Sequence, residues 1–110
     1  MARLDARSHL RALAGETIWT ATQRRPNRIL RVTDHEVVVA TSKSPSGERV
    51  PLEWVQAAFD RLAAGEEVRI SVSSLGYRSA FVGAAMLSLR NVELLTGPTR
   101  VRLNRRDARA

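Results

Sequence analysis

The most regular stretch of this chain is Pro51-Leu-Glu-Trp-Val-Gln-Ala-Ala-Phe-Asp-Arg-Leu-Ala-Ala-Gly65. Its large apolar residues recur every three or four positions, at Leu52, Val55, Phe59 and Leu62. This spacing predicts a helix with one apolar face. Pro51 suits the first turn, where its missing N–H removes no hydrogen bond, and Gly65 suits the end. Because such a helix has to bury its apolar face against other elements, the segments around it decide the fold.

The chain after this helix predicts a strand and then a second, more apolar helix. Residues 68–73 alternate apolar and polar side chains, as a strand does. Residues 74–79 form a loop, and residues 80–89 are apolar on nearly every side, which indicates a buried, central helix capped by Ser79. A short strand, a turn and a last strand are expected at residues 92–95, 97–98 and 100–103.

The chain before the long helix predicts one more helix and a strand hairpin. Residues 3–14 carry apolar side chains at helical spacing and end at Gly15. β-Branched residues then indicate strands, and the polar stretches between them indicate loops. The strands are expected at residues 17–22, 28–33 and 36–41, the last two as a hairpin, and the loops at residues 23–27 and 42–48.

This order of elements favours a single small α+β domain, in which an antiparallel sheet packs against about three helices. A chain of 110 residues can build one core of this kind. No linker or internal repeat divides it. We therefore expect one domain at residues 1–103 and a mobile, basic tail at residues 104–110.

Seventeen of the eighteen basic side chains are arginine, and the formal net charge is +7. This charge on a small domain favours a polyanionic partner, DNA above all. Arginine binds phosphate or guanine through two parallel hydrogen bonds, whereas lysine offers a point charge. The codon usage of a GC-rich genome also favours arginine over lysine, but it does not explain the sign of the charge. Arg3, Arg7 and Arg11 form a helical stripe that suits solvent or sequence-independent attraction to phosphate.

Residues that carry out catalysis are scarce. The chain has no cysteine, and its two histidines, His9 and His35, stand apart from any metal-ligand pattern. The adjacent acids Glu66 and Glu67 occupy a turn, where a solvated role is expected. Phosphate-loop and nucleophile-elbow motifs are absent from the sequence. The sequence therefore predicts a protein that is not an enzyme and uses no metal or cofactor.

The sequence also gives an expectation about location. Its first residues alternate charged and apolar side chains and lead into no apolar segment, so they do not resemble a signal peptide. No apolar run approaches the roughly 20 residues that span a bilayer. We expect a cytoplasmic protein with no membrane partner.

The strongest binding signal is the stretch from Ser73 to Ser79, where a strand, a glycine turn and a helix are expected to meet. Its candidate DNA-binding residues are Ser73, Ser74, Tyr77, Arg78 and Ser79. Free N–H groups at the start of a helix bind phosphate, and Arg78 can pair with the same group. Tyr77 can stack on a base or, alternatively, fill the edge of the core.

Two further polar stretches supply cations. Arg24, Arg25 and Arg28 follow the first strand, beside hydroxyl and amide side chains that can contact phosphate or base edges. Lys43 lies within the serine-rich loop at residues 42–48, and Arg49 follows it directly. This loop can reach along a nucleic-acid backbone. Simple solvation is the competing interpretation for both stretches.

The two tryptophans, Trp19 and Trp54, are expected to pack in the core or at its margin, because the chain has few other large side chains to fill its interior. Trp54 lies off the main apolar stripe, so its indole N–H is expected near solvent. For either indole, the alternative is a platform on which a base stacks.

Four segments together resemble a small DNA-binding module of actinomycetes. They are Glu16-Thr17-Ile18-Trp19-Thr20, Arg28-Ile29-Leu30-Arg31-Val32, Val50-Pro51-Leu52-Glu53-Trp54-Val55 and Gly76-Tyr77-Arg78-Ser79-Ala80-Phe81-Val82-Gly83-Ala84. That module occurs alone and as the N-terminal part of McrA-like HNH endonucleases, which restrict modified DNA. The resemblance covers about residues 15–89.

The resemblance implies recognition of DNA that carries 5-methylcytosine, by a protein without a nuclease of its own. The methyl group lies in the major groove, where it can meet an apolar side chain or an arginine bound to the neighbouring guanine; a flipped base can instead enter an aromatic pocket. Trp19, Tyr77 and Arg78 are the candidates for contact with the methylated base. A homodimer remains open, and the alternative function is a protein-interaction or antitoxin-like regulatory module with a basic surface.

Overall fold

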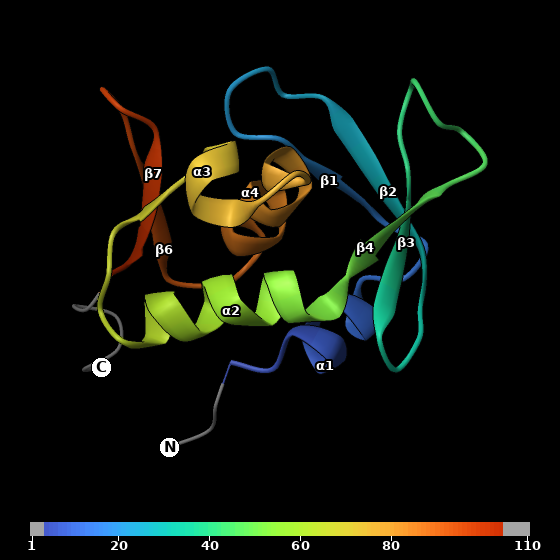
Figure 1. Ribbon diagram of the computed structural model, residues 1–110, viewed down its shortest axis with the longest axis horizontal. Coiled ribbons are helices and arrows are strands. Elements are labelled where there is room, and N and C mark those ends of the chain that lie inside the picture. The colour runs from blue at the N-terminus through green and yellow to red at the C-terminus, as the bar shows by residue number, and fades with distance from the viewer. Residues whose placement is uncertain (1–3, 105–110) are drawn as a thin grey trace.

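Two antiparallel sheets lie on either side of the helices in the computed structural model, which describes residues 4–104 (Figure 1). The strands are β1 (Thr17–Trp19), β2 (Pro26–Val32), β3 (Glu36–Ala40), β4 (Glu48–Pro51), β5 (Val68–Arg69), β6 (Val92–Leu95) and β7 (Arg100–Leu103). The helices are α1 (Ala6–Ala12), α2 (Leu52–Ala63), α3 (Val72–Leu75) and α4 (Ser79–Leu87). The larger sheet has the order β1-β2-β3-β4 and the smaller one β5-β7-β6. The α+β class is confirmed, with two sheets in place of one and four helices in place of about three.

Helix α2 runs from the larger sheet to the smaller one and supplies the centre of the core (Figure 1). The predicted apolar face is confirmed, because all four of its large apolar residues are buried: Leu52, Val55, Phe59 and Leu62. Pro51 was expected inside the first turn and instead lies just before the helix, with φ −60° and ψ 129°. It ends β4, where it pairs with Glu36, so the sheet fixes its extended conformation.

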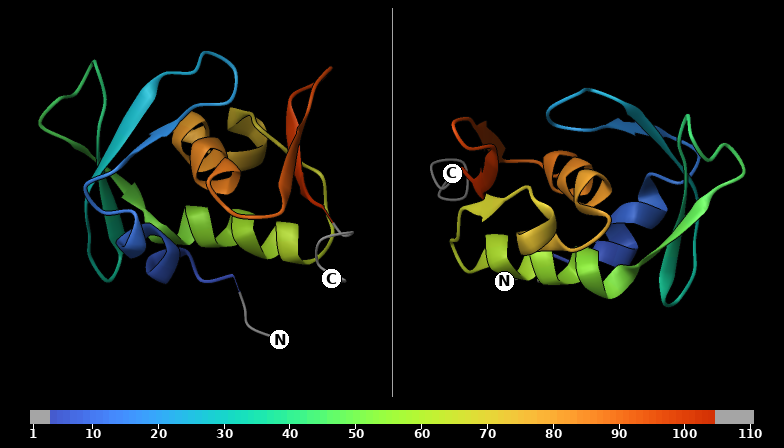
Figure 2. Two further views of the ribbon diagram at one scale, coloured as in Figure 1. Left: turned by 180° about the vertical axis from the view of Figure 1, so that it is seen from behind. Right: turned by 45° about the horizontal axis from the view of Figure 1, so that its top comes forward.

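Helix α4 lies between the two sheets, as both views in Figure 2 show. The predicted buried, central helix is confirmed, since residues 81–86 have no exposed side. A helix that is packed on all sides needs no polar face, which explains its uniform apolar composition. The predicted cap is wrong: Arg78 occupies the N-cap position, Ser79 is the first helical residue, and no side chain caps the helix.

The strand expected at residues 68–73 is wrong beyond Arg69, because the chain turns there into the short helix α3. The cause is local. The Ser71 hydroxyl accepts a hydrogen bond from the N–H of Ser74 at 3.3 Å, which caps a helical turn in place of continuing the strand. Gly76 then ends α3 with φ +88°, a conformation that favours glycine, so the expected loop at residues 74–79 contains the end of α3 and a short turn.

The first strand is also shorter than predicted and ends at Trp19. Two hydrogen bonds close a turn at residues 20–25: Thr20 N–H donates to the Arg25 carbonyl at 3.0 Å, and Arg25 N–H donates to Thr20 Oγ1 at 2.8 Å. Strand β2 therefore starts at Pro26, inside the stretch expected as a loop. The hairpin of β2 and β3 is confirmed, and β4 extends it to a third strand.

Hydrogen bonds hold both ends of the described chain. The Asp5 carboxylate accepts the N–H of Ser8 at 3.1 Å, so α1 begins later than expected and covers a shorter span. Asn104, the first residue of the expected mobile tail, donates its N–H to the Asn91 carbonyl at 2.6 Å. Residues 1–3 and 105–110, to which the rest of the first-helix and tail predictions refer, lie outside the described residues.

Candidate nucleic-acid interface

The three polar stretches singled out in the sequence meet around the first turn of α4. Residues 20–23 and Arg25 line a hollow of about 320 Å³ together with Ser79 and Ala80. Residues 77–81 line an adjoining hollow of about 190 Å³ with Asn27, Thr41 and Glu48. The turn at residues 20–25 and the loop at residues 41–47 both project to the upper side of Figure 1, and the reversed view in Figure 2 agrees. Tertiary structure thus brings distant candidate residues to one surface.

Tyr77 and Arg78 form a stacked pair on this surface. Tyr77 is 73% exposed, which excludes a role in filling the core edge. The Arg78 guanidinium carbon lies 4.7 Å from the centre of its ring, in the geometry of a cation–π contact. Arg78 Nη1 also forms an ion pair with Glu48 Oε2 at 2.7 Å. The predicted phosphate-binding arginine is therefore neutralised by an acid from β4, and a phosphate would have to replace that acid.

The predicted serines have different positions. Ser74 is held by Arg61, whose Nη1 donates to the serine hydroxyl at 3.0 Å and to its carbonyl at 3.2 Å. Ser73 is exposed and lies 3.2 Å, hydroxyl to hydroxyl, from Ser71. Ser79 lines both hollows at the start of α4. Of the three, Ser79 has the position in which a hydroxyl can meet a ligand at the helix start.

The cations of the described chain fall into two groups. One group is held by acids, in the pairs Arg7 and Arg11 with Asp34, Arg61 with Glu66, Arg78 with Glu48, Arg100 with Glu67, and Arg102 with Glu67 and Glu93. The other group has no acidic partner within residues 4–104, and it comprises Arg24, Arg25, Arg28, Arg31, Lys43, Arg49, Arg69 and Arg90. Six of these eight belong to the larger sheet or to the turns between its strands. The pairing of Arg7 and Arg11 weakens the expected role of the first-helix stripe, of which Arg3 lies outside the described residues.

Three of the cations without acidic partners lie on the outer face of the larger sheet. In the strand register Arg28 is opposite Ala40, and Arg31 and Arg49 flank Val38 on either side. Neighbouring positions in β3, Val37 and Val39, are part of the core cluster, whereas Val38 is not. The row of Arg31, Val38 and Arg49 therefore faces away from the core.

Arg31 was not among the predicted binding residues, and an even alternation along β2 would place it on the core side. The register shifts between Ile29 and Arg31, which turns Arg31 outward. The neighbouring residues contain no sequence pattern that predicts this bulge. The loop before β4 covers part of the same face at Gly47, where an added Cβ would lie 2.7 Å from Val38 Cγ1, so only glycine fits there at φ +107°.

Lys43 lies in the exposed part of this loop, whose shape is set by its own hydrogen bonds. Ser44 N–H donates to Thr41 Oγ1 at 3.1 Å, and the Ser44 hydroxyl donates to Glu48 Oε1 at 2.8 Å. The loop is therefore held beside Arg78, which binds the same glutamate. Lys43 is exposed and has no acidic partner among residues 4–104, and its contact with a ligand backbone stays a prediction.

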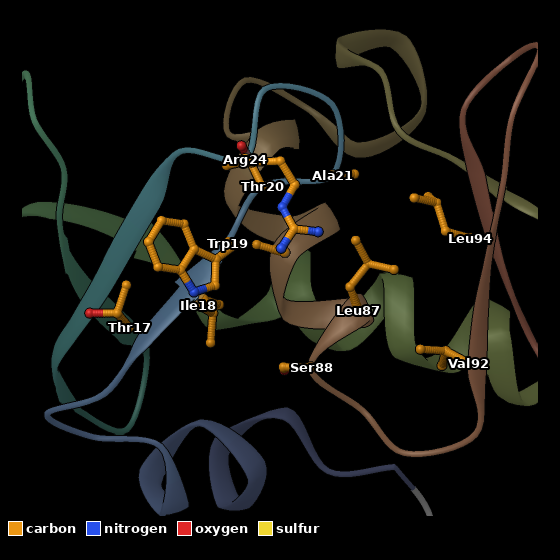
Figure 3. Close-up of a pocket in the computed structure, with 11 residues that line it drawn as sticks. Thr17, Ile18, Trp19, Thr20, Ala21, Arg24, Leu87, Ser88, Val92 and Leu94 are labelled. Atoms are coloured by element: carbon orange, nitrogen blue, oxygen red, sulfur yellow. The ribbon is translucent and has the colours of Figure 1, made fainter.

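Trp19 lines a groove between β1 and α4, which Figure 3 shows in close-up. The groove has a volume of about 480 Å³ and is lined by Thr17, Ile18, Trp19, Thr20, Ala21, Arg24, Ala84, Leu87, Ser88, Val92 and Leu94. Trp19 is 50% exposed, so the expectation of core packing is wrong for this residue. It is confirmed for Trp54, which is half-buried against the core near Gly76.

His9, one of the two isolated histidines, has a structural position. Its Nε2 lies 2.8 Å from the Ser88 hydroxyl, which itself donates to the Ala85 carbonyl at 2.6 Å. Since that hydroxyl has one proton, His9 has to be the donor, and its ring also meets Phe59 edge-on at 5.8 Å. Burial lowers the pKa of His9 and thereby favours its neutral form. Residues 4–104 contain no group of three or more histidine or acidic side chains that could hold a metal ion.

Two further findings concern the whole chain. Among the described residues, no helix has the length and apolar character needed to cross a membrane. No model of a known protein family matches the chain, and comparisons with curated proteins and with solved structures found no match.

Proposed function

We propose that this protein is a DNA-binding module without catalytic activity, which holds the phosphate backbone with the cations of its larger sheet. The observation that supports this most directly is the uneven pairing of its cations. Arg24, Arg25, Arg28, Arg31, Lys43 and Arg49 have no acidic partner among residues 4–104, while Arg100 and Arg102 in β7 of the smaller sheet do. A cation that the fold does not neutralise is available to a phosphate without breaking an existing ion pair.

The arrangement of these cations suits an extended polyanion. Arg28 and Arg31 lie in β2, and Arg49 lies in β4, two strand spacings or about 10 Å away. The turn with Arg24 and Arg25 continues from the same sheet. Six phosphate contacts would release about as many counterions, so affinity should fall roughly 1,000-fold between 50 and 200 mM salt. An acidic protein partner, the alternative, offers carboxylates at less regular spacing and a weaker dependence on salt.

We further propose that the preferred DNA carries 5-methylcytosine. This finer proposal rests on the resemblance to the actinomycete module and on the chemistry of the exposed aromatic residues, Trp19 and Tyr77. Tyr77 with its stacked Arg78 offers a flat surface and a cation side by side, which suits an arginine that binds guanine and packs against the neighbouring methyl group.

The test is direct binding of the full chain to two duplexes of one sequence, one with 5-methylcytosine and one without, at 50 and 200 mM salt. We expect both to bind at low salt, the methylated duplex more tightly, and both to weaken steeply as salt rises. Absence of binding to either duplex would refute the DNA-binding proposal. Equal affinity for the methylated and unmethylated duplexes would support the DNA-binding proposal and refute the proposed methyl specificity.

A further inference from the structure

The groove between β1 and α4 combines apolar walls with an open rim. Five large apolar side chains in residues 4–104 remain exposed, and two of them line this groove, Trp19 at 50% and Leu94 at 41%. Figure 3 shows Leu87 of α4 between them at the floor of the groove. Its volume of about 480 Å³ lies within the range of sites that hold small molecules.

The single charge in the groove lining is that of Arg24. The closed turn at residues 20–25 holds Arg24 in a left-handed conformation, with φ 52°, and its guanidinium extends over the groove in Figure 3. Within residues 4–104 this guanidinium has no acidic partner. The absence of an acid from the lining favours an occupant with negative charge.

The other polar groups of the lining narrow the choice of occupant. Thr20 Oγ1 already accepts the N–H of Arg25, and the Ser88 hydroxyl is engaged with His9 and Ala85. An edge strand such as β1 has one side without a strand partner, so its backbone can offer hydrogen bonds at the groove. The groove therefore presents an aromatic face, one cation and a strand edge, which match the base face, the phosphate and the base edge of a nucleotide.

We propose that this groove binds one nucleotide whose base has left the DNA stack, with the base against the indole of Trp19 and its phosphate at Arg24. The inference rests on the proposed DNA-binding function and adds a site to it. Arg28, which is opposite Thr17, lies two residue pairs from the Trp19–Pro26 pair. A DNA backbone that crosses the outer face of the larger sheet can thus pass Arg28 and reach the groove.

The experiment uses the two tryptophans of the chain. A Trp54→Phe variant leaves Trp19 as its sole indole, so its fluorescence reports on the groove. The probes are three duplexes of one sequence with a paired base, a mismatched base or an abasic site at one central position. We expect the mismatched duplex to bind about tenfold more tightly than the paired one, because its base is easier to extrude, and to quench Trp19 emission. The abasic duplex should bind without that quenching.

Affinity measurements on the otherwise unchanged chain give an independent readout. Trp19→Ala should weaken binding of the mismatched duplex by about 5- to 150-fold, the range of base–aromatic stacking, and remove the preference for it. Trp19→Phe, which keeps a ring, should restore part of the preference. Val72→Ala is the matched control, because Val72 is a 63% exposed apolar side chain that lies outside the groove, and it should retain the preference.

Two results would overturn the nucleotide site while leaving DNA binding intact: a mismatch preference that survives in Trp19→Ala, or equal quenching by the abasic and mismatched duplexes. Circular dichroism of each variant confirms that it is folded. If none of the duplexes binds the unaltered chain, the proposed function itself fails, and the site fails with it.

Discussion

In the smaller sheet, Arg100 and Arg102 are held by acids, with Nε of each 2.8 Å from a carboxylate oxygen of Glu67 and Glu93 respectively. In the larger sheet, the outward-facing arginines of β2 and β4 have no such partner within residues 4–104. The hydrogen bond from Arg100 lowers the pKa of the Glu67 carboxyl, and the charge of Arg102 adds to this effect. The same side chain thus completes a surface ion-pair network in one sheet and leaves a basic face on the other.

This difference shows that net charge is a poor guide to where a polyanion binds. The formal charge of +7 belongs to the whole chain, but the fold neutralises part of it locally. Among residues 4–104, six of the eight cations without an acidic partner lie on one sheet and its turns, at positions 24, 25, 28, 31, 43 and 49. Substitutions in the shared core, in each sheet and at individual ion pairs can test this difference between the two sheets.

The largest effect is expected from Phe59→Ala, which removes a fully buried ring from the helix that connects the two sheets. The cavity should lower the free energy of unfolding by about 3–5 kcal/mol. Because both sheets pack on the same core, they should lose structure in one transition, as measured by urea unfolding followed by amide hydrogen exchange. Separate transitions for the two sheets would show that they are independent units.

The next largest effect is expected from a double variant of the larger sheet, which carries Arg28→Gln and Arg31→Gln. Removing two phosphate contacts should weaken DNA binding about 100-fold at low salt and lower the slope of log affinity against log salt by about 2. The matched control carries Arg100→Gln and Arg102→Gln in the smaller sheet. Titrations that gave the same loss for both variants would contradict a functional division between the sheets.

A smaller effect is expected at the Arg78–Glu48 ion pair. Glu48→Gln removes the charge that neutralises Arg78 while retaining an acceptor for the Ser44 hydroxyl. DNA affinity should rise by about threefold to tenfold, roughly the net contribution of one ordinary hydrogen bond. Arg78→Ala should lower it. If Arg78→Ala leaves the affinity unchanged in the same titration, the loop at residues 76–79 does not contact DNA.

The smallest effect concerns His9, which links α1 to the end of α4 beside the Trp19 groove. Burial lowers its pKa in the folded state below the ordinary value of 6.5, so the unfolded chain takes up the proton first. Stability is therefore full above pH 6.5 and is lost as the pH falls through the lowered pKa. Urea unfolding at pH 7.5 and 5.5 should show this loss, and His9→Gln should reduce it. His35→Gln, at the exposed turn after β2, is the control; an equal reduction there would refute the role of His9.

The fold was predictable where one pattern runs long enough to outweigh local chemistry. Helix α2 and the buried α4 follow directly from apolar spacing and composition. The errors lie where a single side chain redirects the backbone: the Ser71 hydroxyl starts α3 in a stretch with strand alternation, and Thr20 closes a turn within an expected strand. These hydrogen bonds form between neighbouring residues. Residue propensities alone, however, do not tell whether such a bond or the competing strand is more stable.

The candidate site was less predictable, because it depends on register and pairing. The sequence pointed to Arg24, Arg25 and Arg28, and these do lack acidic partners among residues 4–104. It also favoured Arg78, whose partner Glu48 lies thirty positions earlier in the chain. Arg31 was missed because a bulge in β2 decides which way it faces.

By itself, then, the sequence determined the α+β class, the two main helices, the basic character and the lack of recognisable catalytic motifs, since composition and periodicity carry that information. Only the tertiary structure decided which arginines are neutralised, that Trp19 stands beside an open groove, and that three distant polar stretches meet at the start of α4. The physical reason is that each of these properties depends on a partner far away in the chain. The sequence determines which side chains are charged, whereas the fold determines which of those charges lack a partner and can bind a ligand.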